Sequence, residues 1–205
     1  LVAGDGSSRD EFGTSIAVSE DAVVVGASRD QISTDADQGS AYVFVLSNGV
    51  WFERAKLVAG DGAAEDNFGN AVAISDDTVL VGSFSDDIMP NTNLGSVYAF
   101  QQSNAGWHER QKITTGDGAS FHQFGSSVAL SGDTAVVGAP FAGRGPTARQ
   151  GAAFIFVRSG SDWIQQAVLV ASDGSAGDEF GSSVAIFGDT VLVGAYADDF
   201  RTNEG

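Results

Sequence analysis

The chain has 205 residues, of which 10 are Lys or Arg and 27 are Asp or Glu, so its formal net charge is −17. A surface of this sign repels nucleic acid and anionic membranes, and no apolar run approaches the roughly 18 residues of a membrane span. We therefore expect neither nucleic-acid binding nor membrane insertion. Cysteine is absent, which excludes a disulfide framework and thiol chemistry.

A fixed spacing of 56 residues runs through the chain. The pairs Asp-Gly and Val-Gly and a single tryptophan recur at this spacing together with the pair Phe-Gly. A constant period of this length is typical of repeat proteins, in which each unit is one supersecondary structure. It also argues against catalysis, because near-identical units rarely hold one asymmetric active site, and we expect no enzymatic activity. Phe-Gly occurs at Phe12-Gly13, Phe68-Gly69, Phe124-Gly125 and Phe180-Gly181.

The repeat divides the chain into units whose borders we place at the Asp-Gly pairs. The chain begins and ends out of phase with the repeat and has no initiator methionine, so we expect it to be a piece of a longer protein. Residues 1–4 are the end of an outer strand of a preceding unit, residues 5–60, 61–116 and 117–172 are three complete units, and residues 173–205 are the first half of a fourth.

Each unit contains four short extended runs, which in the first complete unit cover residues 15–19, 22–27, 40–45 and 51–58. The runs are rich in β-branched and aromatic residues and are bounded by turn residues, and no segment has a sustained helical period. Four antiparallel strands per repeated unit are typical of propeller blades. We therefore predict an all-β fold, a β-propeller of four-stranded antiparallel blades. The second strand should be buried between blades, and the fourth should be outer and half exposed.

Only two residues separate the first and second runs, a length typical of tight hairpins. In such a hairpin Ser19 pairs with Ala22, and extension of this register places Gly13 opposite Ser28 and position 10 opposite position 31. Small residues at this open end would let the two backbones approach closely. The second residue of each turn is an aspartate, which tolerates a left-handed backbone. These residues are Asp21, Asp77, Asp133 and Asp189.

These motifs resemble a known family. Phe124-Gly125 followed by Val137-Gly138-Ala139-Pro140 is similar to the FG-GAP repeat of integrin α-subunit β-propellers, and the whole pattern is closer still to bacterial and algal FG-GAP-like repeat proteins. The resemblance covers the whole chain and implies a propeller of about seven blades in a secreted or surface-displayed protein. The remaining blades would then come from the same polypeptide or from a neighbouring chain.

The chain departs from the integrin pattern in one respect. Integrin blades that bind calcium carry an Asp-x-Asp-x-Asp-Gly loop between their first and second strands. The corresponding loop here has only two residues, so the integrin calcium sites cannot be carried over to this chain.

Aspartates gather instead at the open end of the hairpins, one before Phe-Gly and one after the second strand. The third unit lacks both, since His122 and Ala142 stand at these positions, and this joint loss indicates that the two positions act together. Oxygen-rich clusters suit calcium, whereas solvated loop acids are the alternative in so acidic a chain. The predicted calcium ligands are Asp10, Asp30, Asp66, Asp86, Asp178 and Asp198.

Two further features are candidate contact sites. Arg144 and Arg149 lie in the loop between the second and third strands of the third unit, where we predict a specific contact with a partner. A tryptophan opens the fourth strand of three units. Packing between blades explains this placement, and sugar stacking is the alternative. These residues are Trp51, Trp107 and Trp163.

Together these features predict a non-enzymatic β-propeller segment, extracellular or at the cell surface, that serves adhesion, protein–protein interaction or structural assembly. Its partner would be a protein or a glycan, and calcium is the candidate cofactor if a cation binds at all. The alternatives are a carbohydrate-binding, lectin-like propeller and a non-catalytic propeller attached to a secreted enzyme. The two histidines, His108 and His122, occupy different positions of the repeat and lack metal-ligand spacing.

Overall fold

The computed structural model describes residues 1–115, 122–143 and 148–198, and within them the chain forms strands and no helix. No helix long and apolar enough to cross a membrane is therefore found in this described part of the chain. The strands form antiparallel sheets of four, four, four and two strands, in chain order within each sheet. This confirms the predicted all-β fold with three four-stranded blades and the first two strands of a fourth.

The strands fall at the same positions in every unit. The first blade consists of β1 (Phe12–Ser19), β2 (Ala22–Ala27), β3 (Ser40–Ser47) and β4 (Val50–Leu57). The second consists of β5 (Ala71–Ser75), β6 (Thr78–Ser83), β7 (Ser96–Ser103) and β8 (Gly106–Ile113). The third consists of β9 (Ser127–Ser131), β10 (Thr134–Ala139), β11 (Ala152–Ser159) and β12 (Asp162–Leu169). The fourth contains β13 (Phe180–Phe187) and β14 (Thr190–Ala195).

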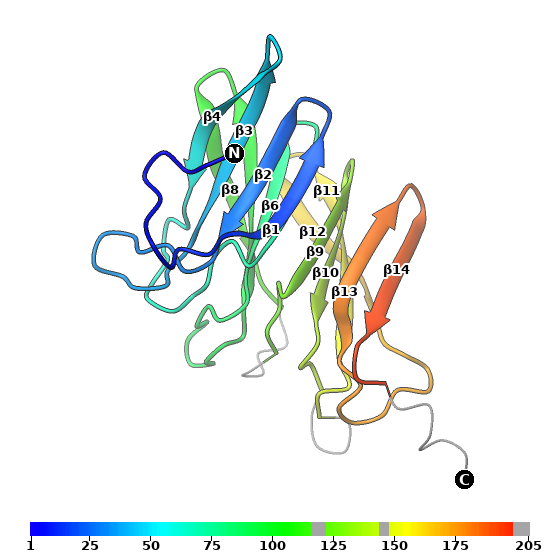
Figure 1. Cartoon of the computed structure of the whole chain (residues 1–205). Helices are drawn as coiled ribbons and strands as arrows, with labels where there is room; N and C mark the ends of the chain where they lie inside the picture. The colour runs from blue at the N-terminus through cyan, green and yellow to red at the C-terminus, as the bar shows by residue number, and fades with distance from the viewer. Residues whose placement is uncertain (116–121, 144–147, 199–205) are drawn as a thin grey trace.

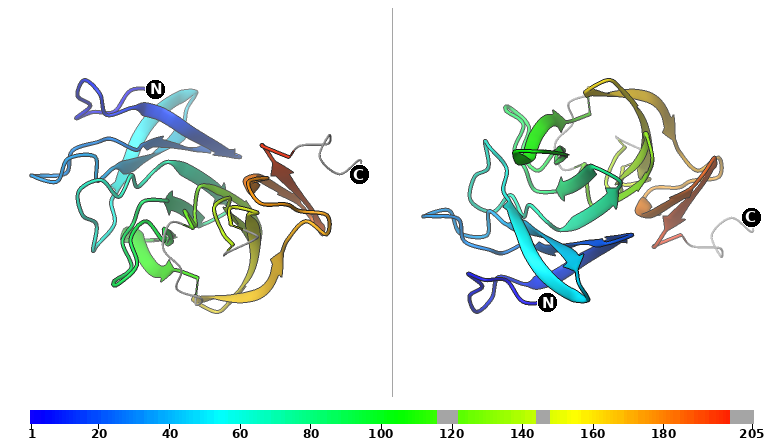
Figure 2. Two further views of the ribbon diagram at one scale, coloured as in Figure 1. Left: turned by 90° about the horizontal axis from the view of Figure 1, so that it is seen from below. Right: turned by 90° about the horizontal axis from the view of Figure 1, so that it is seen from above.

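The blades stand side by side in an arc that does not close (Figures 1 and 2). The first strands of successive blades, β1, β5, β9 and β13, are neighbours along the inside of the arc. The fourth strands lie on the outside, and β4 is largely exposed, as predicted for an outer strand. Two-residue turns lie at one end of every blade, and the long loops lie at the other end (Figure 1).

The turns between first and second strands differ from the prediction in one detail. The left-handed backbone falls on the first turn residue, with φ of 44° at Glu20 and 50° at Asp76, and not on the following aspartate. The carbonyl oxygen of Asp21 instead accepts a hydrogen bond from the Leu46 amide at 2.8 Å. The recurrent aspartate therefore ties the turn to the third strand.

The predicted register is correct near the turn and wrong at the open end. Ser19 pairs with Ala22 as expected, but Phe12 pairs with Ala27, because β1 contains a bulge between Phe12 and Ile16. Gly13, with φ of 99°, lies within this bulge, and a bulge adds residues to one strand only. Gly13 therefore does not lie opposite Ser28, and position 10 lies next to Arg29 rather than opposite position 31.

Glycines bring neighbouring blades, rather than the two strands of one hairpin, into close backbone contact. A Cβ on Gly26 would overlap the carbonyl oxygen of Gly69 in the next blade, and one on Gly39 would overlap that of Phe68. The Phe68 amide donates to the Gln38 carbonyl at 2.9 Å. Phe-Gly of one blade is thus inserted against the second and third strands of the preceding blade, and only glycine leaves room there.

At each junction between blades, a short side chain also donates a hydrogen bond to the carbonyl of the Phe-Gly glycine. Ser15 Oγ donates to the Gly69 carbonyl at 2.8 Å, and Ser127 Oγ donates to the Gly181 carbonyl at 2.8 Å. The second blade has Ala71 at the equivalent position, and there Asn70 Nδ2 takes over and donates to the Gly125 carbonyl at 3.1 Å. The same glycine carbonyl is therefore capped at all three junctions, by whichever residue can reach it.

Hydrophobic clusters fill the space between blades. Val24 and Val43 of the first blade pack with Phe68 and Val81 of the second, and an equivalent cluster joins the second blade to the third. The two end faces of the arc have no such neighbour. Ile16 in the first blade is 63 % exposed, whereas its equivalent in the second blade, Val72, is 7 % exposed. The exposure follows from position in the arc, because both side chains are apolar and β-branched.

The exposure of the tryptophans also depends on the position of their blade in the arc. Trp163 is 5 % exposed in the cluster between the second and third blades, and Trp107 packs against the cluster between the first and second. Trp51 is 36 % exposed on the first blade, where no blade covers it. These positions favour packing between blades over sugar stacking.

Candidate functional site

A buried ionic network holds the loop end of the first blade together. The Lys56 ammonium lies 2.6 Å from Asp5 Oδ2 and 2.7 Å from Asp30 Oδ2. Asp30 Oδ2 also accepts a hydrogen bond from Ser40 Oγ at 2.6 Å. The Tyr42 hydroxyl lies 2.8 Å from Asp5 Oδ1 and 3.0 Å from Asp30 Oδ2. One lysine thus joins the entry of the blade to the loop after its second strand.

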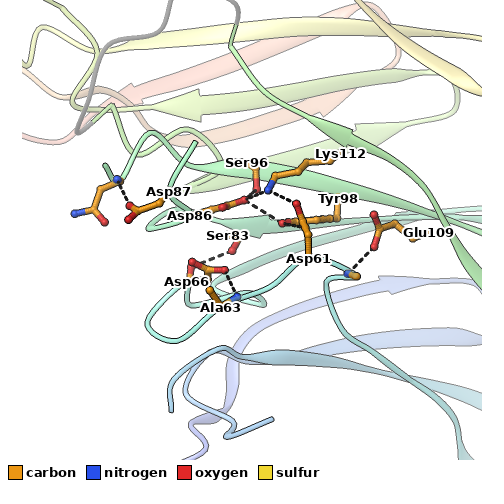
Figure 3. A network of polar contacts seen from close by, with 12 residues as sticks. Asp61, Ala63, Asp66, Ser83, Asp86, Asp87, Ser96, Tyr98, Glu109 and Lys112 are labelled. Carbon is orange, nitrogen blue, oxygen red and sulfur yellow. Dashed lines mark hydrogen bonds and ion pairs between the residues drawn. The ribbon is translucent and has the colours of Figure 1, made fainter. Parts of the chain in front are cut away.

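The second blade repeats this network nearly atom for atom (Figure 3). Lys112 Nζ lies 2.8 Å from Asp61 Oδ2 and 2.7 Å from Asp86 Oδ2. Tyr98 contacts both carboxylates, at 2.8 Å and 3.0 Å, and Ser96 Oγ donates to Asp86. The lysine also lies 5.2 Å from the centre of the Tyr98 ring, a cation–π distance.

The network shifts the pKa values of its members as its contacts require. Hydrogen bonds from Lys56 and then Tyr42 lower the pKa of Asp5. Burial opposes the charged form of Lys56, but its bonds to Asp30 and Asp5 outweigh burial and raise the lysine pKa. Burial raises the pKa of Tyr42 to about 12. The ammonium therefore stays charged and the phenol neutral at physiological pH.

The aspartates that precede Phe-Gly have a different partner set from those in the network. Asp10 accepts a hydrogen bond from the Ser7 amide, Asp66 from the Ala63 amide at 2.6 Å, and Asp178 from the Ser175 amide at 2.6 Å. Each side chain thus caps its own turn, three residues back, and all three are buried. Asp198, by contrast, is exposed.

The predicted calcium ligands are therefore brought together in pairs by adjacent backbone segments, but their carboxylates make separate contacts. The Arg29 amide donates to the Asp10 carbonyl at 3.2 Å, yet the carboxylate of Asp10 contacts the Ser7 amide, whereas that of Asp30 contacts Ser40 and Lys56. Within the described residues, no group of three or more His, Cys, Asp or Glu side chains is arranged to hold a metal ion. Asp30 and Asp86 each contact a lysine, Lys56 and Lys112 respectively. Calcium binding stays a prediction.

A calcium titration tests that prediction directly. If calcium binds, it should raise the melting temperature, because a ligand specific for the folded state stabilises it. Asp30→Asn should abolish the effect in the first blade, and the third unit should contribute nothing. Calorimetry with no heat of calcium binding would remove the calcium hypothesis.

We expect Asp66 to make the stability of the chain depend on pH. Burial, and then the Asp86 carboxylate, raises its pKa from 3.8 to about 6. The folded state therefore binds this proton more tightly than the unfolded state, and the resulting stabilisation is lost as pH rises from about 4 to about 6. Asp66→Asn keeps an acceptor for the Ala63 amide and cannot titrate. Its stability relative to the unsubstituted chain should rise over this window and level off above it.

Thermal melts from pH 4 to pH 8 in a calcium chelator measure this difference. Asp5→Asn is the matched control, because the pKa of Asp5 is lowered, so its stabilising contribution is present at neutral pH and lost on acidification. Parallel curves for Asp66→Asn and the unsubstituted chain would contradict the prediction.

The third unit replaces four of the five network residues with apolar ones and keeps the aspartate equivalent to Asp5, at position 117. Ala142, Ala152, Phe154 and Val168 stand where the first blade has Asp30, Ser40, Tyr42 and Lys56. The ring of Phe154 keeps the edge contact with Phe124 at 5.3 Å, as Tyr98 does with Phe68 at 5.4 Å. The prediction from sequence found the loss of one aspartate and missed its three partners. Comparison of all positions at the 56-residue spacing carries that signal, since the four positions change together.

Of the two arginines predicted to contact a partner in the third unit, the structure describes one, and that one makes contacts within the chain. Arg144 lies outside the described residues. Arg149 stacks over the Phe141 ring at 3.9 Å and pairs with Glu179 at 2.9 Å. The arginine thus joins the third blade to the entry of the fourth. A partner contact at Arg149 stays a prediction.

Two pockets open among the long loops, one lined by the first unit alone and one between the loops of the first and second units. The larger, of about 440 Å³, is lined by Asp10, Arg29, Asp37 and Lys56 among others. The second, of about 380 Å³, shares Arg29 and Asp37 with the first, and its other charged lining residues are all acidic: Glu65, Asp66 and Asp87. Residues 5–10, 28–39, 56–70 and 84–95, which carry these pockets, are called the loop face below.

Comparisons with known proteins place the chain in a family. The family model for the FG-GAP repeat matches residues 1–44, 51–100, 107–156 and 163–205. Three of these matches begin in the fourth strand of one blade and continue into the strands of the next blade, so each spans a blade junction. No curated protein matches the chain. Because the matches cover most of its length, the chain belongs to the FG-GAP repeat family.

Proposed function

We propose that this chain is a non-catalytic protein-interaction module that acts outside the cell and binds its partner through the loop face. FG-GAP repeats form propeller-type interaction modules, and the resemblance to secreted and surface-displayed relatives supports the extracellular setting. The observation that carries the proposal is the asymmetry of the blades. One end has only two-residue turns, whereas the other has long loops with two adjoining pockets.

The charge of the loop face indicates the chemistry of the partner. Asp37, Glu65 and Asp87 line the second pocket with a single cation, Arg29, and the whole chain carries a net charge of −17. A basic surface on the partner would be complementary, and association would slow as salt screens the attraction. The arrangement does not favour catalysis, because the exposed His108 and the buried His122 lie on different elements.

The proposal is tested by binding the chain to extracellular protein fractions and to a glycan array. The double variant Asp37→Asn with Glu65→Gln neutralises two charges on the loop face. Its matched control, Glu20→Gln with Asp76→Asn, neutralises two exposed charges at the turn end. We expect protein binding that weakens in the first variant and not in the second. Binding to glycans alone would favour the carbohydrate-binding alternative, and equal losses would place the binding surface elsewhere.

A further inference from the structure

A groove of about 240 Å³ lies between the outer strand of the first blade and the turn end of the second. Its walls are Arg54 and Ala55 of β4 and residues 102–107, which form the turn between β7 and β8. The groove lies at the opposite end of the blades from the loop face and shares no lining residue with either loop pocket.

At the next junction the chain itself fills the equivalent place. Gln111 is the repeat equivalent of Ala55, and Trp163 is that of Trp107. The Trp163 amide donates to Gln111 Oε1 at 2.6 Å, and Gln111 Nε2 donates to the Trp163 carbonyl at 3.2 Å. Only about 10 Å³ remains open at that junction, where Arg158 also forms part of the lining. A primary carboxamide therefore caps both backbone groups of the tryptophan.

Trp107 presents the same backbone groups to the open groove. Trp107 pairs with Gln102, and Trp163 pairs with Arg158. Each of these pairs lies next to the residue pair that closes the two-residue turn of its hairpin. In an antiparallel ladder, such a pair is not hydrogen-bonded to its partner strand, so the Trp107 amide and carbonyl point away from β7. The methyl group of Ala55 can cap neither. The indole Nε1 of Trp107 is also buried without a hydrogen-bond partner among the described residues.

We propose that this groove binds a carboxamide: a glutamine or asparagine side chain of a partner polypeptide that caps Trp107 as Gln111 caps Trp163. The amide group both accepts from the tryptophan N–H and donates to its C=O, which a carboxylate cannot do. The internal Gln111 contact supplies the geometry, and the 240 Å³ groove supplies the space. The inference concerns a second surface and stands whether or not the loop face binds a protein.

The test uses the 205-residue chain labelled with fluorotryptophan and titrated with propionamide. The fluorine resonance of Trp107, assigned with Trp107→Phe, should shift to saturation. The resonance of Trp163, which Gln111 already caps, should not shift. The resonance of Trp51, on which no blade packs, should not shift either. N,N-dimethylpropionamide accepts a hydrogen bond but cannot donate one, and it should bind about tenfold more weakly because one of two bonds is lost.

Two substitutions close the groove in different ways. Ala55→Gln gives the first blade the side chain that the second blade has, and it should weaken propionamide binding at least about tenfold, since the added side chain occupies the site. Ala55→Met fills the space without an amide and should cause the same loss, which keeps the proposal testable if the glutamine variant does not fold. Unchanged binding in these variants, no shift at Trp107, or an equal shift at Trp51 would overturn the proposal.

Discussion

Replacing Gly69 with alanine should destabilise the 205-residue chain by about 3–5 kcal/mol, the sum of overpacking and left-handed backbone strain. A Cβ at this position would overlap the carbonyl oxygen of Ser40 in the preceding blade. Neither backbone can yield easily, because both belong to hydrogen-bonded blades. The φ of Gly69 is 94°, a conformation that adds strain for any residue with a side chain. Denaturant unfolding followed by tryptophan fluorescence measures the loss.

Gly13 provides the matched control for this prediction. It occupies the same position of the repeat and has nearly the same φ, 99°, but no atom lies within 4 Å of the place where its Cβ would be. Gly13→Ala should therefore cost only the backbone strain, about 1–2 kcal/mol. Equal losses at the two positions would mean that backbone strain, and not contact between blades, makes the Phe-Gly glycine necessary.

The repeat made the fold predictable in detail. Because each pattern occurs up to four times, the strand bounds, the two-residue turns and the buried second strand could be inferred without any long-range information. The strand register at the open end of the first hairpin could not be inferred in this way. Its error comes from the bulge between Phe12 and Ile16, and a bulge adds residues without changing the apolar alternation on either side. The partner of the Phe-Gly glycine was missed for a different reason, since it lies in the preceding blade.

The candidate site was predictable only in part. Asp30 and Asp86 were recognised because they are acidic and recur, but their contacts with Lys56 and Lys112 join a loop to the fourth strand across 26 positions of the sequence. The chemistry of an aspartate depends on what lies opposite it, and sequence spacing alone did not show a cation there. The third unit carried the missing information, because the residues lost together with the aspartate are the ones that contact it.

Lys112→Met should destabilise the chain by about 3 kcal/mol. The substitution keeps most of the side-chain volume and removes the one cation that contacts Asp86 among the described residues, and Asp86 is only 4 % exposed. Breaking a buried ion pair from one side costs about 3–5 kcal/mol, and we expect the lower end because the Lys112 side chain is 22 % exposed. Hydrogen bonds from Lys112 and Tyr98 outweigh burial and lower the pKa of Asp61. The cost should therefore shrink as pH falls below about 4 and this carboxylate is protonated.

The residues of the third blade define a combined substitution of the second blade that should remove the stability loss expected for Lys112→Met. Asp86→Ala, Ser96→Ala, Tyr98→Phe and Lys112→Val together give the second blade the residues of the third, in which Phe154 packs against Phe124 as Tyr98 packs against Phe68. Replacement of a whole buried ionic group by well-packed apolar residues is often neutral or stabilising. The free energy of unfolding of the quadruple variant should therefore lie within about 1 kcal/mol of that of the unsubstituted chain, although this variant also lacks the Lys112 ammonium. If it is as unstable as Lys112→Met, the network contributes stability of its own, and the apolar third blade must be stabilised by contacts that the second blade lacks. If it is neutral, the network is interchangeable with an apolar cluster for folding, and its presence in two blades must be explained by what it does to the loop face.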